Sequence, residues 1–135
     1  MQLQNLQNVV NFHGQVPRAE VDAFYQKSHV FLFPSFREPS GNVVMEAMSH
    51  GLAMIVANRG GPGYVVNSNC GYVIDVDTPE QYSTKISQAI QALLDNNEKI
   101  ESMGKASRAY IEKNCLWDTK INRLLEFYQD IFQNN

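Results

Sequence analysis

The sequence predicts an α/β protein in which helices flank a parallel sheet of about four strands. Four short apolar runs, near Val9, Val30, Met54 and Tyr72, are rich in β-branched and aromatic residues, which is typical of buried strands. Segments with the apolar spacing of amphipathic helices follow most of these runs. Alternating strands and helices of this kind form half of a doubly wound unit, in which the strands lie parallel.

The first predicted strand covers residues 9–12, and a loop follows it. Pro17 then marks the start of a helix over residues 18–27, because proline is tolerated where the backbone N–H has no helical partner. A second strand, residues 30–33, ends at Pro34. A polar loop carries the chain to the next helix.

That next helix is predicted over residues 43–48, with Gly51 placed where a helix ends on a left-handed residue. A strand over residues 54–57 follows, and residues 58–63 form a glycine-rich turn that we expect to be flexible. The turn lacks the G-x-G-x-x-G spacing of a dinucleotide fingerprint. The last strand is predicted at residues 72–74.

Three helices complete the chain. Asp77 or Thr78 caps the first, with Pro79 behind the cap, and the second runs from about residue 98 to 113. Gly104 inside the second helix costs roughly 1 kcal/mol relative to alanine, so we expect close packing there. Asp118 or Thr119 caps the last helix, which carries a long apolar stripe.

Composition excludes several classes of function. The 135 residues, 44% hydrophobic and 19% charged, favour one globular domain. A net charge of −3 gives no basic field for nucleic acid, so we expect no nucleic-acid partner. No apolar run is long enough to span a bilayer. Cys70 and Cys115 lack zinc-ligand spacing, and we expect no metal site.

The residues with the clearest chemistry are Glu38, Gly41 and Glu46, which surround one strand-to-helix junction. The start of a helix presents unpaired N–H groups that suit a phosphate, and Gly41 leaves that backbone accessible. The two carboxylates would accept hydrogen bonds from sugar hydroxyls. Together they suit a nucleotide-sugar, although Glu38 alone is most often a solvated loop charge and Glu46 alone a favourable charge near a helix start.

The same stretch resembles the signature of the retaining glycosyltransferases of family 4. The matching residues are Pro34-Ser35, Glu38-Pro39-Ser40-Gly41, Glu46-Ala47-Met48, His50-Gly51 and Gly60-Gly61-Pro62. The resemblance implies a GT-B architecture of two facing Rossmann-like domains. Two positions depart from the pattern: Ser40 replaces a common aromatic residue, and no glutamate follows Gly63.

The resemblance also implies a role for each matching residue. Glu38, the catalytic candidate, would bind hydroxyls of the transferred sugar, and Glu46 would bind the ribose hydroxyls. Three backbone amides would hold sugar or diphosphate oxygens, those of Gly41, Asn42 and Val43. The backbone of Gln15 and Val16 would border the nucleotide base. The donor is a nucleoside-diphosphate sugar, and no metal or other cofactor is expected.

Against that family, residues 1–135 correspond to a single, partial C-terminal nucleotide-sugar-binding domain, without the N-terminal acceptor domain. The first two of six strands are also missing, together with the cations expected on them, so we expect this chain alone to be inactive. The missing strands would lie between those at Val9 and Val30. Either these two strands pair directly, or a second copy supplies a strand and the chain self-associates.

The expected partners are therefore the nucleotide-sugar, the missing domain or the acceptor, and a second copy of the chain. The family favours polysaccharide or glycolipid assembly in the cytoplasm, with peripheral contact at the inner membrane surface. Three alternatives stay open: a stand-alone nucleotide-sugar binding module, a non-catalytic oligomerising remnant, and a GT-B-like sugar-nucleotide epimerase. The last needs acid and base groups that the sequence does not show.

Overall fold

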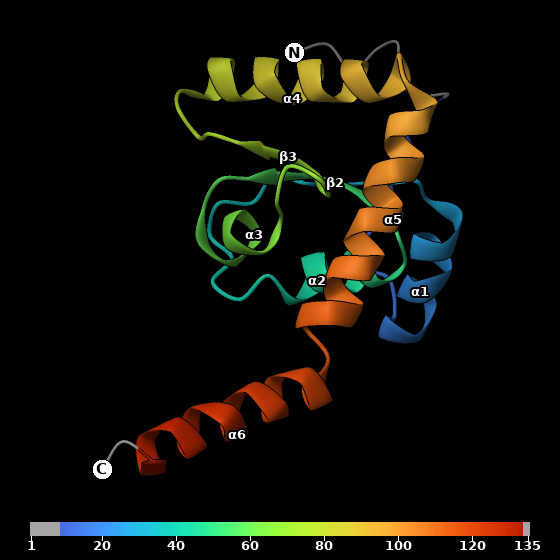
Figure 1. The fold of residues 1–135 in the computed structure, drawn as a ribbon. Helices are drawn as coiled ribbons and strands as arrows, with labels where there is room; N and C mark the ends of the chain where they lie inside the picture. Colours follow the sequence, from blue (N-terminus) through green and yellow to red (C-terminus); the bar gives the residue numbers. More distant parts are fainter. Residues whose placement is uncertain (1–8, 134–135) are drawn as a thin grey trace.

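The computed structural model describes residues 9–133 and shows a sheet between two layers of helices (Figure 1). Three parallel strands form the sheet in the order β1 (Val30–Phe33), β2 (Ala53–Ala57) and β3 (Gly71–Ile74). The central strand, β2, is buried at all five positions, which explains its uniformly apolar sequence. The α/β class predicted from the sequence is confirmed.

Helices follow the strands in the expected alternation. Their bounds are α1 (Arg18–Lys27), α2 (Asn42–Ser49), α3 (Gly60–Val65), α4 (Pro79–Leu94), α5 (Asn97–Asn114) and α6 (Trp117–Gln133). α4 covers one face of the sheet, and α2 and α3 cover the other (Figure 1). The cap of α4 is Thr78, whose hydroxyl accepts a hydrogen bond from the Gln81 N–H at 3.3 Å.

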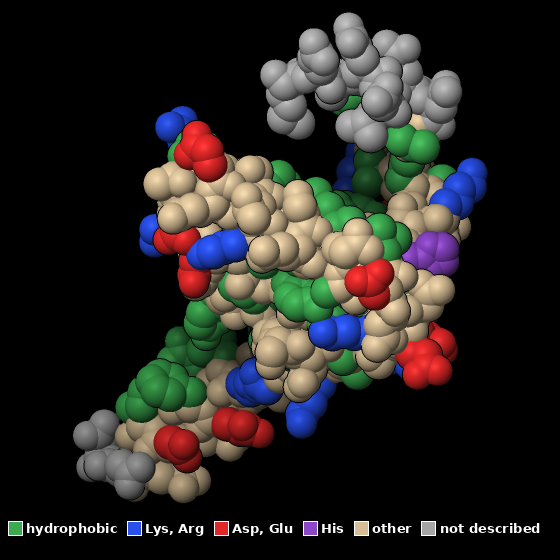
Figure 2. Space-filling view, turned by 90° about the horizontal axis from the view of Figure 1, so that it is seen from above, with side chains coloured by type: hydrophobic (Ala, Val, Ile, Leu, Met, Phe, Trp, Pro, Cys, Tyr) green, Lys and Arg blue, Asp and Glu red, His purple; other side chains and the backbone are tan. Residues whose placement is uncertain are grey.

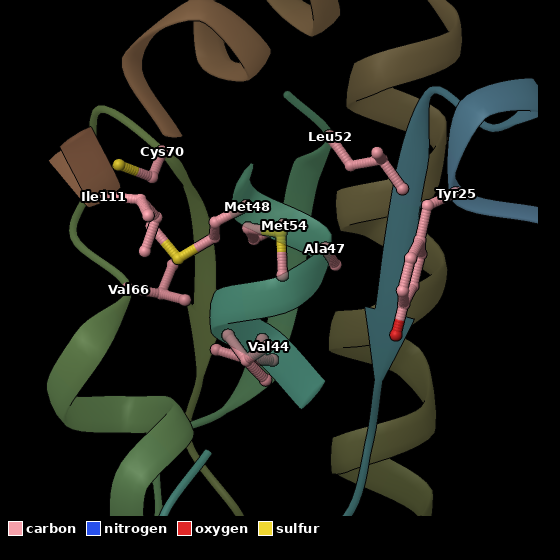
Figure 3. Packing of buried hydrophobic residues seen from close by; sticks show 10 residues of the cluster. Tyr25, Val44, Ala47, Met48, Leu52, Met54, Val66, Cys70 and Ile111 are labelled. Carbon is pink, nitrogen blue, oxygen red and sulfur yellow. The ribbon is translucent and has the colours of Figure 1, made fainter. Parts of the chain in front are cut away.

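Each face of the sheet has its own hydrophobic core. Side chains of β2 alternate between the two cores, Met54 and Val56 facing α2, Ala53 and Ile55 facing α4. The larger core is formed by Tyr25, Val44, Ala47, Met48, Leu52, Met54, Val56, Val66, Cys70 and Ile111 (Figure 3). α2 is therefore fixed on its buried side, which determines the direction of its N-terminus.

α5 crosses from one core to the other. It places Met103 in the core beneath α4 and Ile111 in the core around α2. At the crossing, Gly104 lies against the turn after α2, and a Cβ added there would lie 2.2 Å from the carbonyl oxygen of Gly51. The close packing expected at Gly104 is confirmed.

The strand predicted at residues 9–12 is absent. Residues 9–12 form no strand, so the sheet has three strands within residues 9–133 rather than about four. Val9 and Phe12 are 71% and 86% exposed, and the neighbouring His13 ring packs 4.7 Å from that of Phe24 on α1. The segment thus lies against α1 instead of pairing with β1. Of the two arrangements expected for these strands, direct pairing within one chain does not occur.

α6 differs from the other helices because it has no buried residue. It begins at Trp117, so Asp118 lies in its first turn and is not its cap. The helix extends away from the sheet (Figure 1), and its hydrophobic side chains gather on the surface (Figure 2). Of the helices in the described part, none is both long and apolar enough to cross a membrane.

Candidate functional site

The candidate site lies where the parallel strands end. The loops after β1 and β2 meet at this carboxyl edge, where open α/β sheets usually bind their ligands. The loop after β1 leads into α2, and the loop after β2 leads into α3. A hydrogen bond from the Gly61 N–H to the Glu38 carbonyl oxygen, 3.2 Å long, joins the two.

Glycines allow these two loops to approach backbone to backbone. Gly41, which precedes α2, has φ +72°, a left-handed conformation that favours glycine. A Cβ on Gly61 would lie 2.4 Å from the Ser40 carbonyl carbon, so a larger residue would push the loops apart. The segment predicted as a flexible glycine-rich turn is therefore the start of α3, and its glycines serve close packing rather than flexibility.

Glu38 turns its carboxylate back onto its own loop. Its Oε1 accepts three hydrogen bonds, from the Ser40 hydroxyl at 2.7 Å, the Gly41 N–H at 3.0 Å and the Ser40 N–H at 3.1 Å. These donors, the Ser40 hydroxyl first, hold the pKa of the Glu38 carboxyl below its ordinary value. Its Oε2 takes no hydrogen bond from any residue that the structure describes, and so remains able to accept one from a ligand.

The tip of α2 is partly occupied by this arrangement. The Gly41 N–H is used by Glu38, while the N–H groups of Val44 and Met45 both donate to the Gly41 carbonyl oxygen. The N–H groups of Asn42 and Val43 have no acceptor within residues 9–133. In this conformation, two of the three predicted amides have no protein acceptor in the described chain and can still donate to an anion.

Glu46 lies on the second turn of the same helix and pairs with the first residue of α1. Its Oε2 accepts a hydrogen bond of 2.6 Å from Arg18 Nη1. This hydrogen bond and the charge of Glu46 raise the pKa of Arg18. Burial, followed by the charge of Glu46, raises the pKa of Tyr25, another residue of α1.

Gln15 and Val16 stand immediately before α1. Gln15 is exposed and Val16 is half-buried. Because Arg18 follows them closely and reaches Glu46, the structure brings this segment toward the second turn of α2. Thus Glu38 and the amides lie at the tip of α2, and Glu46 lies next to the segment that would border a base.

Sequence reasoning missed three side chains around these glutamates: Arg18, Tyr25 and Ser40. Ser40 could have been found, because a hydroxyl two residues after a loop carboxylate is well placed to bond to it. The partnership of Arg18 with Glu46 spans 28 residues and depends on how α1 packs against α2, which no local pattern indicates.

Other contacts hold the loops at this edge in place. Asn58 Nδ2 donates to Asp75 Oδ1 at 2.6 Å, which links the ends of β2 and β3. The Tyr82 hydroxyl on α4 donates to the Pro34 carbonyl oxygen at 3.0 Å, which restrains the loop after β1. No group of three or more His, Cys, Asp or Glu side chains in the described chain is arranged to hold a metal ion.

A hollow of about 990 Å³ lies elsewhere, at the amino edge of the sheet. It is bordered by His29 before β1, Gly51 before β2 and Gly104 on α5. The residues of the candidate site lie at the other end of the strands. Size alone therefore does not identify the site, and the chemistry of the α2 tip does.

Comparison with known proteins decides the family. Residues 1–110 match the family model described as glycosyl transferases group 1. The chain belongs to this family. The match includes both glutamates, the α2 tip and the segment before α1.

Individual relatives agree with this membership. Spore coat protein SA of Bacillus subtilis (strain 168) is 37% identical over 123 residues, which are 89% of this chain and 32% of that protein. A D-inositol 3-phosphate glycosyltransferase of Streptomyces griseus is 29% identical over 122 residues, 90% of this chain and 25% of that enzyme. The chain thus spans between a quarter and a third of the length of these relatives.

The fold is also found in solved structures. The structure of sucrose-phosphate synthase from Thermosynechococcus elongatus superimposes with a TM-score of 0.76 and 26% identity. The superposition covers 97% of this chain and 32% of that protein. It includes nearly all of this chain, so the arrangement of the strands and helices described above is shared with a larger protein.

Proposed function

We propose that this chain is the donor-binding part of a glycosyltransferase that moves a sugar from a nucleoside-diphosphate sugar to an acceptor. The observation that carries the proposal is the placement of Glu38 at the tip of α2 and Glu46 one turn further, in a chain of the glycosyl transferases group 1 family. The D-inositol 3-phosphate glycosyltransferase among its relatives supports the same class of reaction.

In this proposal the α2 tip binds the diphosphate end of the donor. The N–H groups of Asn42 and Val43 donate to phosphate or sugar oxygens, and the positive end of the helix dipole favours the anion. Gly41 adds a third N–H if the Glu38 carboxylate turns away from it. Because Gly41 has no side chain, the ligand can approach this backbone closely.

The two glutamates then recognise hydroxyl groups. Glu38 accepts hydrogen bonds from the transferred sugar through Oε2, which has no protein donor in the described chain. Glu46 accepts from the ribose, and the backbone of Gln15 and Val16 borders the base. We further propose retention of configuration at the sugar, as in the family that the signature resembles, without a bound metal.

The proposal assigns the remaining functions to parts of a longer protein. The relatives are three to four times as long as the matched region, which leaves room for an acceptor-binding domain and for cations that neutralise the leaving diphosphate. We therefore propose that this chain alone binds the donor without transferring the sugar. The cellular setting we propose is the cytoplasm, with peripheral contact at the inner membrane surface.

Calorimetric titration of the chain with UDP, GDP and ADP and their sugars tests the proposal. One of these ligands should bind, and Glu46→Ala should weaken its binding about tenfold, because a hydrogen bond to a charged group contributes roughly 1.5–3 kcal/mol. Glu80→Ala, on the exposed first turn of α4, is the matched control and should leave the affinity unchanged. Equal affinity of the Glu46→Ala variant and the parent chain would reject the ribose role.

A further inference from the structure

The ion pair between Arg18 and Glu46 connects two helices that are distant in sequence. Their side chains are 69% and 35% exposed, and 28 residues separate them. Exposed ion pairs contribute little to stability because water screens them and ordering the side chains costs entropy. The main consequence of this pair is therefore geometric: it restricts the rotamers of Glu46.

A second residue of α1, Tyr25, is buried and interacts electrostatically with Glu46. Tyr25 is 5% exposed, and its ring packs against Phe31 at 5.9 Å and His50 at 5.2 Å. The charge of Glu46 contributes to the raised pKa of its hydroxyl, so the two groups are close enough to interact. Of these two residues of α1, Arg18 is the one that bonds directly to the Glu46 carboxylate, and its exposed guanidinium is the part that ligand binding can displace or hold.

We propose that Arg18 is a positioning residue for ribose recognition, holding the Glu46 carboxylate in the orientation that accepts hydrogen bonds from the ribose hydroxyls. This inference rests on the proposed function. A ribose presents neighbouring 2′ and 3′ hydroxyls, and a carboxylate with two oxygens can accept from both. Arg18 bonds to Oε2 at 2.6 Å, a short charge-assisted contact that restricts the orientation of the carboxylate.

The position of Arg18 also links ribose and base recognition. It is the first residue of α1 and directly follows Pro17, next to the segment of Gln15 and Val16 proposed to border the base. A base that orders this segment also orders Arg18, and through it Glu46. Loss of Arg18 leaves Glu46 free to rotate. Ligand binding must then immobilise the Glu46 side chain, and the conformational entropy lost in this step weakens the affinity.

The test compares a nucleotide with its 2′-deoxy counterpart. Calorimetry measures the dissociation constants of UDP and 2′-deoxy-UDP, or of the GDP or ADP pair if those nucleotides bind more tightly. The parent chain should prefer the ribonucleotide about tenfold, as expected for one hydrogen bond to a charged acceptor. Arg18→Ala should reduce this preference to about twofold or less, close to that of Glu46→Ala, while Arg18→Lys should retain most of it.

A matched control exists on α5. Arg108 pairs with Glu112 at 3.2 Å, with side chains 65% and 62% exposed, and borders the hollow at the amino edge of the sheet rather than the α2 tip. Arg108→Ala removes an ion pair whose arginine is about as exposed as Arg18, and it should change neither affinity nor preference. If Arg18→Ala does not fold, Arg18→Met replaces it in the test, because methionine keeps much of the length of the side chain without its charge.

Each remaining outcome has a defined meaning. If Arg18→Ala weakens both nucleotides equally and the preference is unchanged, Arg18 has a merely structural role and the inference is wrong, while the proposed function stands. If Arg18→Ala strengthens binding, Arg18 competes with the ribose, which also overturns the inference. If the parent chain binds none of the nucleotides, the proposed function itself fails.

Discussion

Ser40 supplies two of the three hydrogen bonds that hold the Glu38 carboxylate on the tip of α2. Its hydroxyl is the largest cause of the lowered pKa of Glu38, ahead of the Gly41 and Ser40 amides. Because the folded-state pKa lies below the ordinary value, these bonds stabilise the fold above the unfolded-state pKa. That contribution is lost as the pH falls through the folded-state pKa.

Ser40→Ala should therefore raise the pKa of Glu38 toward its ordinary value of 4.5. The variant should also lose less stability than the parent chain on acidification below this value, because less of its stability depends on an ionised Glu38. Carboxyl NMR titration measures the pKa directly. Ser87→Ala, which removes a hydroxyl contact within α4, is the control and should leave the pKa of Glu38 unchanged. An unaltered titration of Glu38 in Ser40→Ala would contradict the assignment.

The surroundings of the two glutamates could be predicted from the sequence only in part. Glu38 and Gly41 could be placed at a helix tip, because strand, loop and helix signals follow one another within a few residues. The Glu38 carboxylate folding back onto the Gly41 N–H could not be predicted, since the same residues also permit an extended loop. The contact of Arg18 with Glu46 depends on tertiary packing, and no local signal indicates it.

Gly104 shows how packing between elements can override helix propensity. Replacement by alanine in an exposed helix would stabilise it by about 1 kcal/mol. In α5 the added Cβ would lie 2.2 Å from the Gly51 carbonyl oxygen, so backbone must move. Overpacking of this kind costs about 1–3 kcal/mol, and the contact here is backbone against backbone, which cannot adjust by a change of rotamer.

We therefore expect Gly104→Ala to lower the free energy of unfolding by up to about 2 kcal/mol, because the overpacking cost exceeds the gain in helix propensity. Urea denaturation followed by circular dichroism measures the change. Ser102→Ala, at an exposed position of the same helix, is the control and should be neutral or slightly stabilising. A more stable Gly104→Ala variant would show that α5 can move away from the turn after α2 without cost.

The strands and helices were predictable where local signals and burial agree. β2 is apolar throughout because both of its faces are buried, and Pro79 behind a cap at Asp77 or Thr78 predicts the start of α4 to within one residue. The segment 9–12 has the composition of a strand but lacks a partner strand, and a strand is stable only when it pairs. α3 was missed because glycines at its start are typical of turns.

α6 has an apolar side that no other element of the described chain buries. Its 17 residues form a helix about 25 Å long that buries no side chain. Trp117, Ile121, Leu124, Tyr128 and Ile131 repeat at alternating intervals of four and three residues, and between 40% and 79% of each remains exposed. This spacing places them on one side of the helix, where a packed partner would bury them. β1 adds an open sheet edge, since within residues 9–133 it pairs only with β2.

We propose that the isolated chain self-associates, mainly through this apolar side of α6. Light scattering should show a mass above 15.3 kDa that rises with concentration and falls on cooling, because hydrophobic association weakens at low temperature. Replacing Ile121 and Tyr128 together by lysine should return the chain to a monomer, since two charges cannot be buried without partners. In the matched control, lysines replace Asn122 and Gln129, which lie outside the apolar repeat, and this variant should still associate.

If the variant with lysines at positions 121 and 128 still associates, the contact lies on another surface, and the open edge of β1 is the next surface to test. A monomeric parent chain at high concentration would reject self-association altogether.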